Sequence, residues 1–250
     1  MDLSERKHGD ASLRHPWETS RASFLRRLIR RHGPSRPTLN WLDVGAGDAW
    51  FAVTSLDDVS VDDVRLTCWD EFYSEQDLGS LRSDHPDVTF RRDRPEGRFD
   101  LITMLDVLEH VEHDQQFLND AIEACLDPGG VVVVTVPAYQ RLYTRHDEAL
   151  RHHRRYDPAR IRSVLVSAGL RIEVEGGLFS SLLPVRASQK LAETARPGER
   201  QHGVGGWSGG PVLTRAITAV LDADARLSER VGNRGRYLPG LSYWAVCVRS

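Results

Sequence analysis

The segment Trp41-Leu42-Asp43-Val44-Gly45-Ala46-Gly47-Asp48-Ala49 constrains the fold of this chain more than any other part of the sequence. Its apolar first half is typical of a strand that is buried on both faces, as in a parallel sheet. The strand ends in an acidic residue and passes at once into a glycine-rich turn. Gly45 and Gly47 allow backbone angles that are closed to other residues, and they let a ligand approach the main chain closely. The segment therefore predicts a strand, a ligand-binding turn and a helix, in that order.

The same alternation of strand and helix continues along the chain. Apolar runs predict strands, and apolar residues spaced three and four apart predict helices. This alternation favours an α/β fold, with a doubly wound parallel sheet covered by helices on both faces. Strands are expected at 38–44, 64–69, 88–91, 99–105, 131–136, 170–174 and 243–248, and helices at 18–32, 75–83, 113–126, 158–168 and 212–231.

Two regions depart from this alternation. Residues 1–16 are polar and are expected to be disordered or loosely attached, and residues 196–211 are rich in Gly and Pro and should form a loop. We therefore expect an N-terminal segment with one helix at 1–36 and a single domain at 37–250. Within that domain, the insertion 180–240 precedes the last strand and is expected to act as a lid, because loops over the ends of a sheet carry function.

Composition narrows the class of protein. The formal net charge of -3 lacks the basic excess that neutralises phosphates, so it argues against nucleic acid as a partner. The longest apolar run, 131–136, is too short to span a bilayer. The three cysteines have neither the spacing of zinc ligands nor the even number of a disulfide framework, and no secretory signal is visible. We expect a cytoplasmic protein with buried, reduced cysteines and no membrane partner.

Two carboxylates end the first two predicted strands and limit the choice of ligand. Asp43 would repel a pyrophosphate group, but it can receive the ammonium group of an amino-acid ligand, directly or through water. Asp70 can accept hydrogen bonds from both hydroxyls of a ribose. Nicotinamide enzymes use a similar residue, and Asp70 could also be an ordinary turn residue, so Asp70 alone does not decide the ligand.

Together with Phe99-Asp100-Leu101-Ile102 and Asp106-Val107-Leu108-Glu109-His110-Val111, these residues resemble class I S-adenosylmethionine-dependent methyltransferases. Within that class the resemblance is to the small-molecule group that includes the ubiquinone-biosynthesis-type enzymes. It extends from about His15 to the C-terminus and is weakest over 180–240. Ala49 stands where the motif often has a third glycine. The resemblance implies a Rossmann-like, seven-stranded sheet of order 3-2-1-4-5-7-6 with an antiparallel last strand.

The resemblance also implies which residues hold the cofactor, S-adenosylmethionine, and its product, S-adenosylhomocysteine. Asp43, Gly45 and Gly47 would bind the methionine moiety, Asp70 the ribose, and Leu105 would contact the cofactor after the fourth strand. His15-Pro16-Trp17-Glu18 resembles a segment that closes over the cofactor. Trp17 would cover the cofactor and Arg21 would pair with its carboxylate; alternatively, Arg21 lies on an exposed helix. Deletion of residues 1–30 is expected to weaken cofactor binding and to leave the sheet folded.

Two histidine-containing clusters follow the fourth and fifth strands. The first is Asp106-Val107-Leu108-Glu109-His110, and the second is His146-Asp147 with His152-His153-Arg154-Arg155-Tyr156. In a doubly wound sheet both loops open onto one crevice, so His110 and His152 are candidate general bases for removing a proton from the acceptor. Alternatively, Glu109-His110 orients the following helix, and Arg154-Arg155-Tyr156 serves packing. Asp106, Glu109, His110 and His152 also resemble the divalent-metal sites of some methyltransferases that act on catechols or RNA ribose ends. We expect a metal-free base rather than this metal site.

The sequence therefore predicts methyl transfer to a small-molecule acceptor, by O- or N-methylation, in specialised metabolism. RNA 2′-O-methylation, which the metal-like pattern suggests, is the first alternative. A cofactor-binding protein without catalysis is another, and a different use of the sulfonium, such as cyclisation, also stays open. The acceptor and the oligomeric state are not determined by the sequence.

Overall fold

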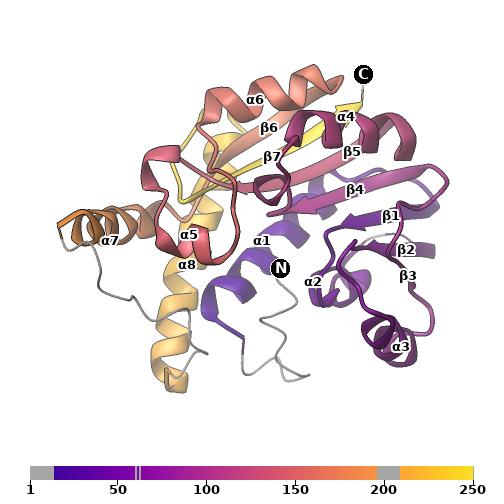
Figure 1. The fold of residues 1–250 in the computed structure, drawn as a ribbon, viewed down its shortest axis with the longest axis horizontal. Coiled ribbons are helices and arrows are strands. Elements are labelled where there is room, and N and C mark those ends of the chain that lie inside the picture. The colour runs from indigo at the N-terminus through magenta and orange to yellow at the C-terminus, as the bar shows by residue number, and fades with distance from the viewer. Residues whose placement is uncertain (1–13, 60, 62, 196–208, 250) are drawn as a thin grey trace.

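The computed structural model describes residues 14–59, 61, 63–195 and 209–249. One seven-stranded sheet has the order β3-β2-β1-β4-β5-β7-β6, with β7 antiparallel to both neighbours and β1 to β5 parallel (Figure 1). The order of the strands and their directions confirm the predicted fold. The strands are β1 (Thr38–Val44), β2 (Asp63–Trp69), β3 (Thr89–Arg91), β4 (Phe99–Leu105), β5 (Leu126–Pro137), β6 (Leu170–Leu178) and β7 (Ser242–Arg249).

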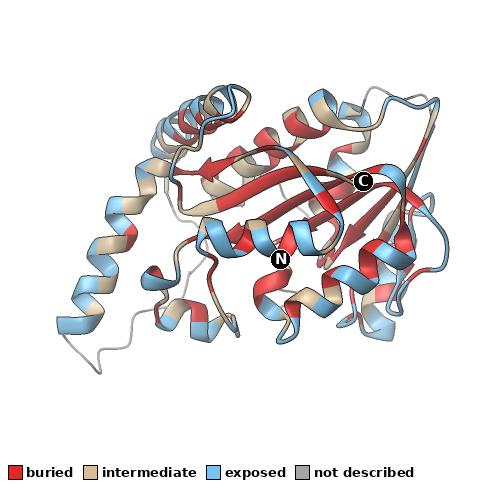
Figure 2. Ribbon diagram, turned by 90° about the horizontal axis from the view of Figure 1, so that it is seen from above, coloured by how far each residue is buried: buried red, intermediate tan, exposed pale blue. Residues whose placement is uncertain are grey.

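Helices cover both faces of the sheet and enclose two apolar cores. One core lies under α1 (Pro16–His32), α2 (Trp50–Thr54), α3 (Glu75–Asp84) and α8 (Pro211–Gly232). The other lies under α4 (Asp114–Cys125) and α6 (Pro158–Ser167). Figure 2 shows buried residues running through the strands, while the outward sides of the helices are exposed. The three layers follow from strands that are apolar on both faces, because each face must be covered.

Helix α1 is part of the core. It begins at Pro16, where a proline is well tolerated, and its Phe24, Leu25 and Leu28 are fully buried against the sheet and α8. The expectation of a loosely attached segment is wrong for its last residues, because Arg14 forms an ion pair with Asp48 beside the glycine turn. Residues 1–13 lie outside the described part of the chain.

Strand β5 is longer than the predicted 131–136. After α4 ends at Cys125, Leu126 already pairs with Phe99 of β4, and the register then shifts before Val131 pairs with Leu101. The Asp127-Pro128-Gly129-Gly130 stretch, which lies between the predicted helix 113–126 and the predicted strand 131–136, is therefore included in the strand. Tertiary pairing with β4 has overridden the local turn signal.

The described part of the region 180–240 contains a short 3-10 helix (Ser180–Leu182) and two α-helices, of which only the second α-helix was predicted. Helix α7 (Leu183–Ala195) projects away from the sheet, whereas α8 packs against α1 and β6 (Figure 1). The C-terminal half of α8 buries Leu221 and Ala225, but Val212 near its start is 79% exposed. The second half of α8 is therefore a layer of the domain, and most of the predicted loop 196–211 lies outside the described residues.

No helix in the described ranges has the length and apolar character needed to cross a membrane. The cysteines Cys68, Cys125 and Cys247 are buried free thiols, as the sequence predicted. The helix that follows the glycine turn is α2, as the segment 41–49 predicted without bounds, whereas the short helix α5 (Arg145–Ala149) was not predicted. Each has only five residues, which is too few for a periodic pattern to be visible.

Candidate functional site

The glycine turn after β1 is bound tightly to the end of β2. The N–H groups of Gly45 and Ala46 donate to the carbonyl of Trp69, and the N–H of Gly47 donates to the Asp70 carboxylate at 2.9 Å. Gly45 has a φ of 65°, and a Cβ there would lie 2.6 Å from Cγ2 of Val107. The turn is therefore held between the ends of β2 and β4 and has no room for a side chain at Gly45.

Ala49 has a backbone conformation that residues with a side chain rarely adopt. It is fully buried and has a φ of 57°, in the left-handed region that favours glycine, immediately before α2. This is the position at which the resemblance expected a third glycine. The backbone thus keeps the conformation that a glycine would suit, and alanine adopts it at some cost in strain.

Asp43 is the buried carboxylate beneath the turn. It accepts a hydrogen bond from the Thr103 hydroxyl at 2.5 Å, and that hydroxyl in turn accepts the indole N–H of Trp41 at 2.9 Å. Burial raises the pKa of Asp43 to about 6, although the hydrogen bond from Thr103 opposes this shift. Few donors reach Asp43, so a bound ammonium group would relieve the cost of its ionisation.

Asp70 also lies at the turn, as predicted. One of its oxygens accepts the N–H of Gly47 and the other accepts the N–H of Phe72 at 3.0 Å. Each carboxylate oxygen has a second lone pair, so Asp70 retains the capacity to accept two hydroxyls. Its contact with Gly47 gives it a structural role in addition to the predicted binding role.

Helix α1 brings Trp17 and Arg21 to the same edge of the sheet. The Arg21 guanidinium lies 5.5 Å from the centre of the Trp17 ring and forms an ion pair with Asp106, which follows β4. Arg21 therefore faces the site rather than solvent. Leu105 is buried at the end of β4, directly before Asp106.

Asp106 has a strained backbone and a well-defined set of partners. Its φ is 57°, and its carboxylate accepts the Thr135 hydroxyl at 2.9 Å in addition to the pair with Arg21. Burial alone would raise the pKa of Asp106, but Arg21 and Thr135 outweigh burial and hold the pKa below its ordinary value. The Asp106 carboxylate thus holds Arg21 at this edge of the sheet.

His110 and His152 lie together, as the topology predicted. Their ring centroids are 4.6 Å apart and the rings are nearly perpendicular. The loops that carry them are joined by the N–H of His153, which donates to the carbonyl of Glu109 at 2.8 Å. Loops after β4 and β5 thus bring two imidazoles to one place at the edge of the sheet that carries the glycine turn.

Glu109 is a fully buried carboxylate next to these imidazoles. Neither of its oxygens has a hydrogen-bond partner within the described residues, and burial, with a contribution from Asp106, raises its pKa well above the ordinary value. Potential metal-ligand atoms of Glu109, His110 and His152 all lie within 4.8 Å of one another. Asp106, the fourth residue of the metal-like pattern, is not in this group, because it is paired with Arg21.

Residues 154–156 have the packing role that was the alternative for them. Arg154 donates to the carbonyls of Val111 and Glu112, and the Tyr156 hydroxyl donates to Asp114 at 2.7 Å. These contacts fasten the loop after β5 to the start of α4. They explain how the loop keeps His152 near His110.

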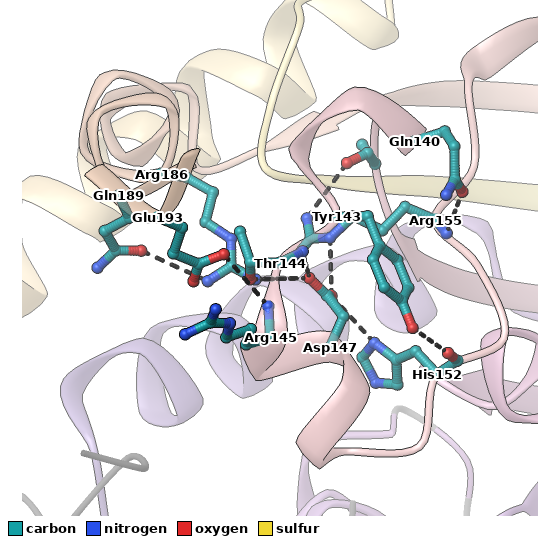
Figure 3. A network of polar contacts seen from close by, with 11 residues as sticks. Gln140, Tyr143, Thr144, Arg145, Asp147, His152, Arg155, Arg186, Gln189 and Glu193 are labelled. Atoms are coloured by element: carbon teal, nitrogen blue, oxygen red, sulfur yellow. Dashed lines mark hydrogen bonds and ion pairs between the residues drawn. The ribbon is translucent and has the colours of Figure 1, made fainter. Parts of the chain in front are cut away.

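Sequence reasoning placed Asp147 in the cluster after the fifth strand but gave it no role, and Asp147 is the centre of the network around His152 that Figure 3 shows. Asp147 is fully buried and accepts hydrogen bonds from the backbone and hydroxyl of Thr144, and from His152, Arg155 and Arg186. Arg186 comes from α7, a helix that was not predicted. A capping pattern at Thr144 and Asp147 was the available signal for this turn.

Comparisons with known proteins agree with this geometry. A family model described as a methyltransferase domain matches residues 17–174. No curated protein matches the sequence. A solved S-adenosylmethionine dependent methyltransferase from Mesorhizobium loti is 19% identical, with a TM-score of 0.51, over 89% of this chain and 96% of that one.

Two further solved structures are similar in fold. Phosphoethanolamine N-methyltransferase 2 of Haemonchus contortus, in complex with S-adenosyl-L-methionine, is 13% identical with a TM-score of 0.52, over 93% of this chain and 52% of that one. The [4+2]-cyclase SpnF is 14% identical with a TM-score of 0.56, over 97% of this chain and 84% of that one. The fold is therefore shared by proteins of different activity.

Proposed function

The chain belongs to the methyltransferase-domain family, and we propose that it transfers the methyl group of S-adenosylmethionine to an oxygen or nitrogen of a small-molecule acceptor. The observation that carries the proposal is the meeting of two sets of residues at one edge of the sheet. Asp43 at the end of β1 and Asp70 after β2 flank the glycine turn that contains Gly47, and the loop that leads to His110 packs directly on this turn through Val107. A cofactor on the turn would thus lie beside the imidazoles.

In this proposal the cofactor is held by charge and by main-chain groups. The Asp43 carboxylate receives the ammonium group, Arg21 receives the carboxylate group under the cover of Trp17, and Asp70 receives the ribose hydroxyls. Leu105 contacts the cofactor from the end of β4. Methyl transfer from a sulfonium is an in-line displacement, so the protein mainly aligns the reactants.

His110 and His152 are proposed to remove the proton of the acceptor. A neutral imidazole can take a proton from a hydroxyl or an amine as the methyl group arrives. His110→Ala and His152→Ala should each lower the methylation rate by about 10²–10⁴-fold without weakening cofactor binding. His153→Ala, at an exposed neighbouring position, is the matched control. Unchanged turnover in both variants would leave alignment alone to account for catalysis.

The cofactor assignment is tested by titration calorimetry with S-adenosylhomocysteine. We expect micromolar affinity, and Asp43→Asn and Asp70→Asn should each weaken it by about tenfold or more, as loss of a charge-assisted hydrogen bond predicts. Asp63→Asn, an exposed carboxylate at the opposite end of β2, should have no effect. Binding of NADH without binding of S-adenosylhomocysteine would contradict the assignment.

A metal-assisted reaction is the second candidate, favoured by the grouping of Glu109, His110 and His152. One carboxylate and two imidazoles suit manganese, iron or zinc, and a metal there would polarise an acceptor hydroxyl, such as that of a small catechol or an RNA ribose end. Calorimetry with Mn²⁺ tests this: binding that Glu109→Gln abolishes supports it, and absence of binding excludes it.

The small-molecule acceptor, the lid role of residues 180–240 and a cytoplasmic location remain parts of the proposal.

A further inference from the structure

We infer that Asp147 is a positioning residue for His152: it fixes the proton of the imidazole on Nδ1 and leaves Nε2 directed away from the carboxylate and available to the site. The inference deepens the proposed function and depends on it for its chemical meaning. The distance from His152 Nδ1 to Asp147 Oδ1 is 3.1 Å. An ionised carboxylate only accepts hydrogen bonds, so Nδ1 must be the donor.

The consequence for Nε2 follows from the chemistry of imidazole. A neutral ring with its proton on Nδ1 has an unprotonated Nε2, which is the nitrogen that can accept a proton. The ring of His152 also contacts the ring of His110, and potential metal-ligand atoms of Glu109, His110 and His152 lie within 4.8 Å of one another. Asp147 therefore selects the tautomer that a base near the acceptor requires.

Asp147 is well suited to this role because its own position and charge are fixed. Burial alone would raise the pKa of Asp147, but hydrogen bonds and positive charges from His152, Arg155, Thr144 and Arg186 hold it well below the ordinary value. The distances from Asp147 to Arg155 and Arg186 are both 2.8 Å. A carboxylate that accepts hydrogen bonds from two arginines and from Thr144 is ionised, and these donors keep it from rotating away from His152.

The donors around Asp147 connect His152 to the rest of the fold. Arg155 also donates to the carbonyl of Ala138 just beyond β5, which ties the network to the edge of the sheet. Arg186 reaches Asp147 from α7 and is itself buried, with 8% of its surface exposed (Figure 3). The orientation of His152 is thus set jointly by the sheet edge and by a helix of the insertion.

A purely structural role is the competing explanation, since a buried network of this kind can simply hold loops together. The two explanations differ in what they require of His152. A structural role does not require a particular tautomer of the His152 ring. A positioning role requires one tautomer, and that tautomer must depend on the charge at position 147.

The test is ¹⁵N NMR of the full chain labelled in its histidine rings, at a pH above the ordinary range of imidazole titration. The signals of His152 are identified by their loss in His152→Gln. In the native protein we expect the tautomer with its proton on Nδ1 and an unprotonated Nε2. Its population should exceed that of the other tautomer by about tenfold or more. A native His152 with its proton mainly on Nε2 would overturn the inference, even if no Asp147 variant folds.

Asp147→Asn keeps the shape of the side chain and removes its charge. In this variant the ratio of tautomers should move toward Nε2–H by about tenfold. Asp120→Asn, at an exposed position of α4, should leave the ratio unchanged, and the signals of exposed His153 provide an internal control. A ratio that does not respond to Asp147→Asn in a folded protein would also overturn the inference.

The same samples separate this inference from the proposed function. S-adenosylhomocysteine is added to the native protein and to Asp147→Asn, and binding is measured by calorimetry. The expected result is equal affinity in both, because Asp147 lies on the acceptor side. If the tautomer behaves as expected but the native protein binds no S-adenosylhomocysteine, the positioning of His152 stands and the proposed cofactor is wrong.

Discussion

Substitution of glycine by alanine is expected to change the stability of the protein in opposite directions at Gly45 and at Gly79. A Cβ at Gly45 would meet Val107 at 2.6 Å in a backbone with φ of 65°, whereas a Cβ at Gly79, in helix α3, has no atom within 4 Å. Gly45→Ala should lower the free energy of unfolding by about 1–3 kcal/mol. Gly79→Ala should raise it by up to about 1 kcal/mol, because alanine favours a helix.

Urea unfolding of the two variants measures both effects at the scale of a single residue. Gly45→Ala should also weaken S-adenosylhomocysteine binding, since the turn that it distorts is the proposed cofactor turn. Gly79→Ala should bind as the native protein does. Equal stability of both variants would show that the turn is less constrained than its contacts indicate.

At the scale of an element, α1 combines a core helix with the proposed cover of the cofactor. Arg21 pairs with Asp106 in the structure and is proposed to receive the cofactor carboxylate. Arg21→Gln should therefore weaken S-adenosylhomocysteine binding by about tenfold, measured by calorimetry. Arg30→Gln, at an exposed position of the same helix, is the control and should bind normally. Equal affinities in the two variants would reduce Arg21 to a structural partner of Asp106.

Deletion of residues 1–30 is a poor test of whether the N-terminal segment contributes to cofactor binding. The deletion would remove Phe24, Leu25 and Leu28, which are almost completely buried, and would uncover Trp244, whose ring meets Phe24 at 5.2 Å. Loss of several buried side chains of this size costs about 2–5 kcal/mol each. We therefore expect the truncated protein to be unfolded or strongly destabilised, contrary to the expectation that the sheet would stay folded.

At the scale of the whole molecule, buried carboxyls couple cofactor binding to pH. The pKa of Asp43 is raised to about 6 in the folded protein, from an ordinary value of 3.8. A raised pKa means that Asp43 contributes stability below pH 4 which is lost as the pH rises through about 6. The cofactor ammonium reverses this loss, because it pairs with the ionised form.

S-adenosylhomocysteine affinity should therefore rise by about tenfold between about pH 5 and pH 7. Asp106 and Asp147, whose pKa values are lowered, act in the opposite direction on the stability of the free protein. Calorimetry across this range isolates the binding effect from those contributions. Asp43→Asn should bind weakly and without this pH dependence; a flat affinity profile in the native protein would argue against contact between Asp43 and the ammonium group.

The strands and the helices α1, α3, α4, α6 and α8 could be predicted from the sequence because their signals are local, whereas α7 was not predicted. The run 38–44, predicted as a buried strand, became β1 with the same bounds, and α3 and α6 begin at the predicted residues. The glycine turn, Asp43 and Asp70 follow directly from strand ends, so their meeting at one edge also follows from a parallel sheet. The meeting of His110 and His152 follows from the same rule.

Other features depend on residues distant in the chain. Asp147 is one acid among several in the sequence, and only the packing of α7 against the loop after β5 brings Arg186 to it. Asp106 resembled a metal ligand until α1 placed Arg21 beside it. The extension of β5 through a turn-like stretch likewise needed the partner strand β4.

The sequence by itself thus determined the class of fold and most of its strands and helices, because hydrophobic periodicity and strand-end motifs are properties of short segments. The strand order followed from the resemblance to class I methyltransferases, and the cofactor-side residues stay predictions. The tertiary structure decided which charges are paired, which nitrogen of His152 contacts Asp147, and that Glu109 has no donor among the described residues. Those properties depend on burial and on the partner that each side chain finds, and both are set only when distant segments pack together.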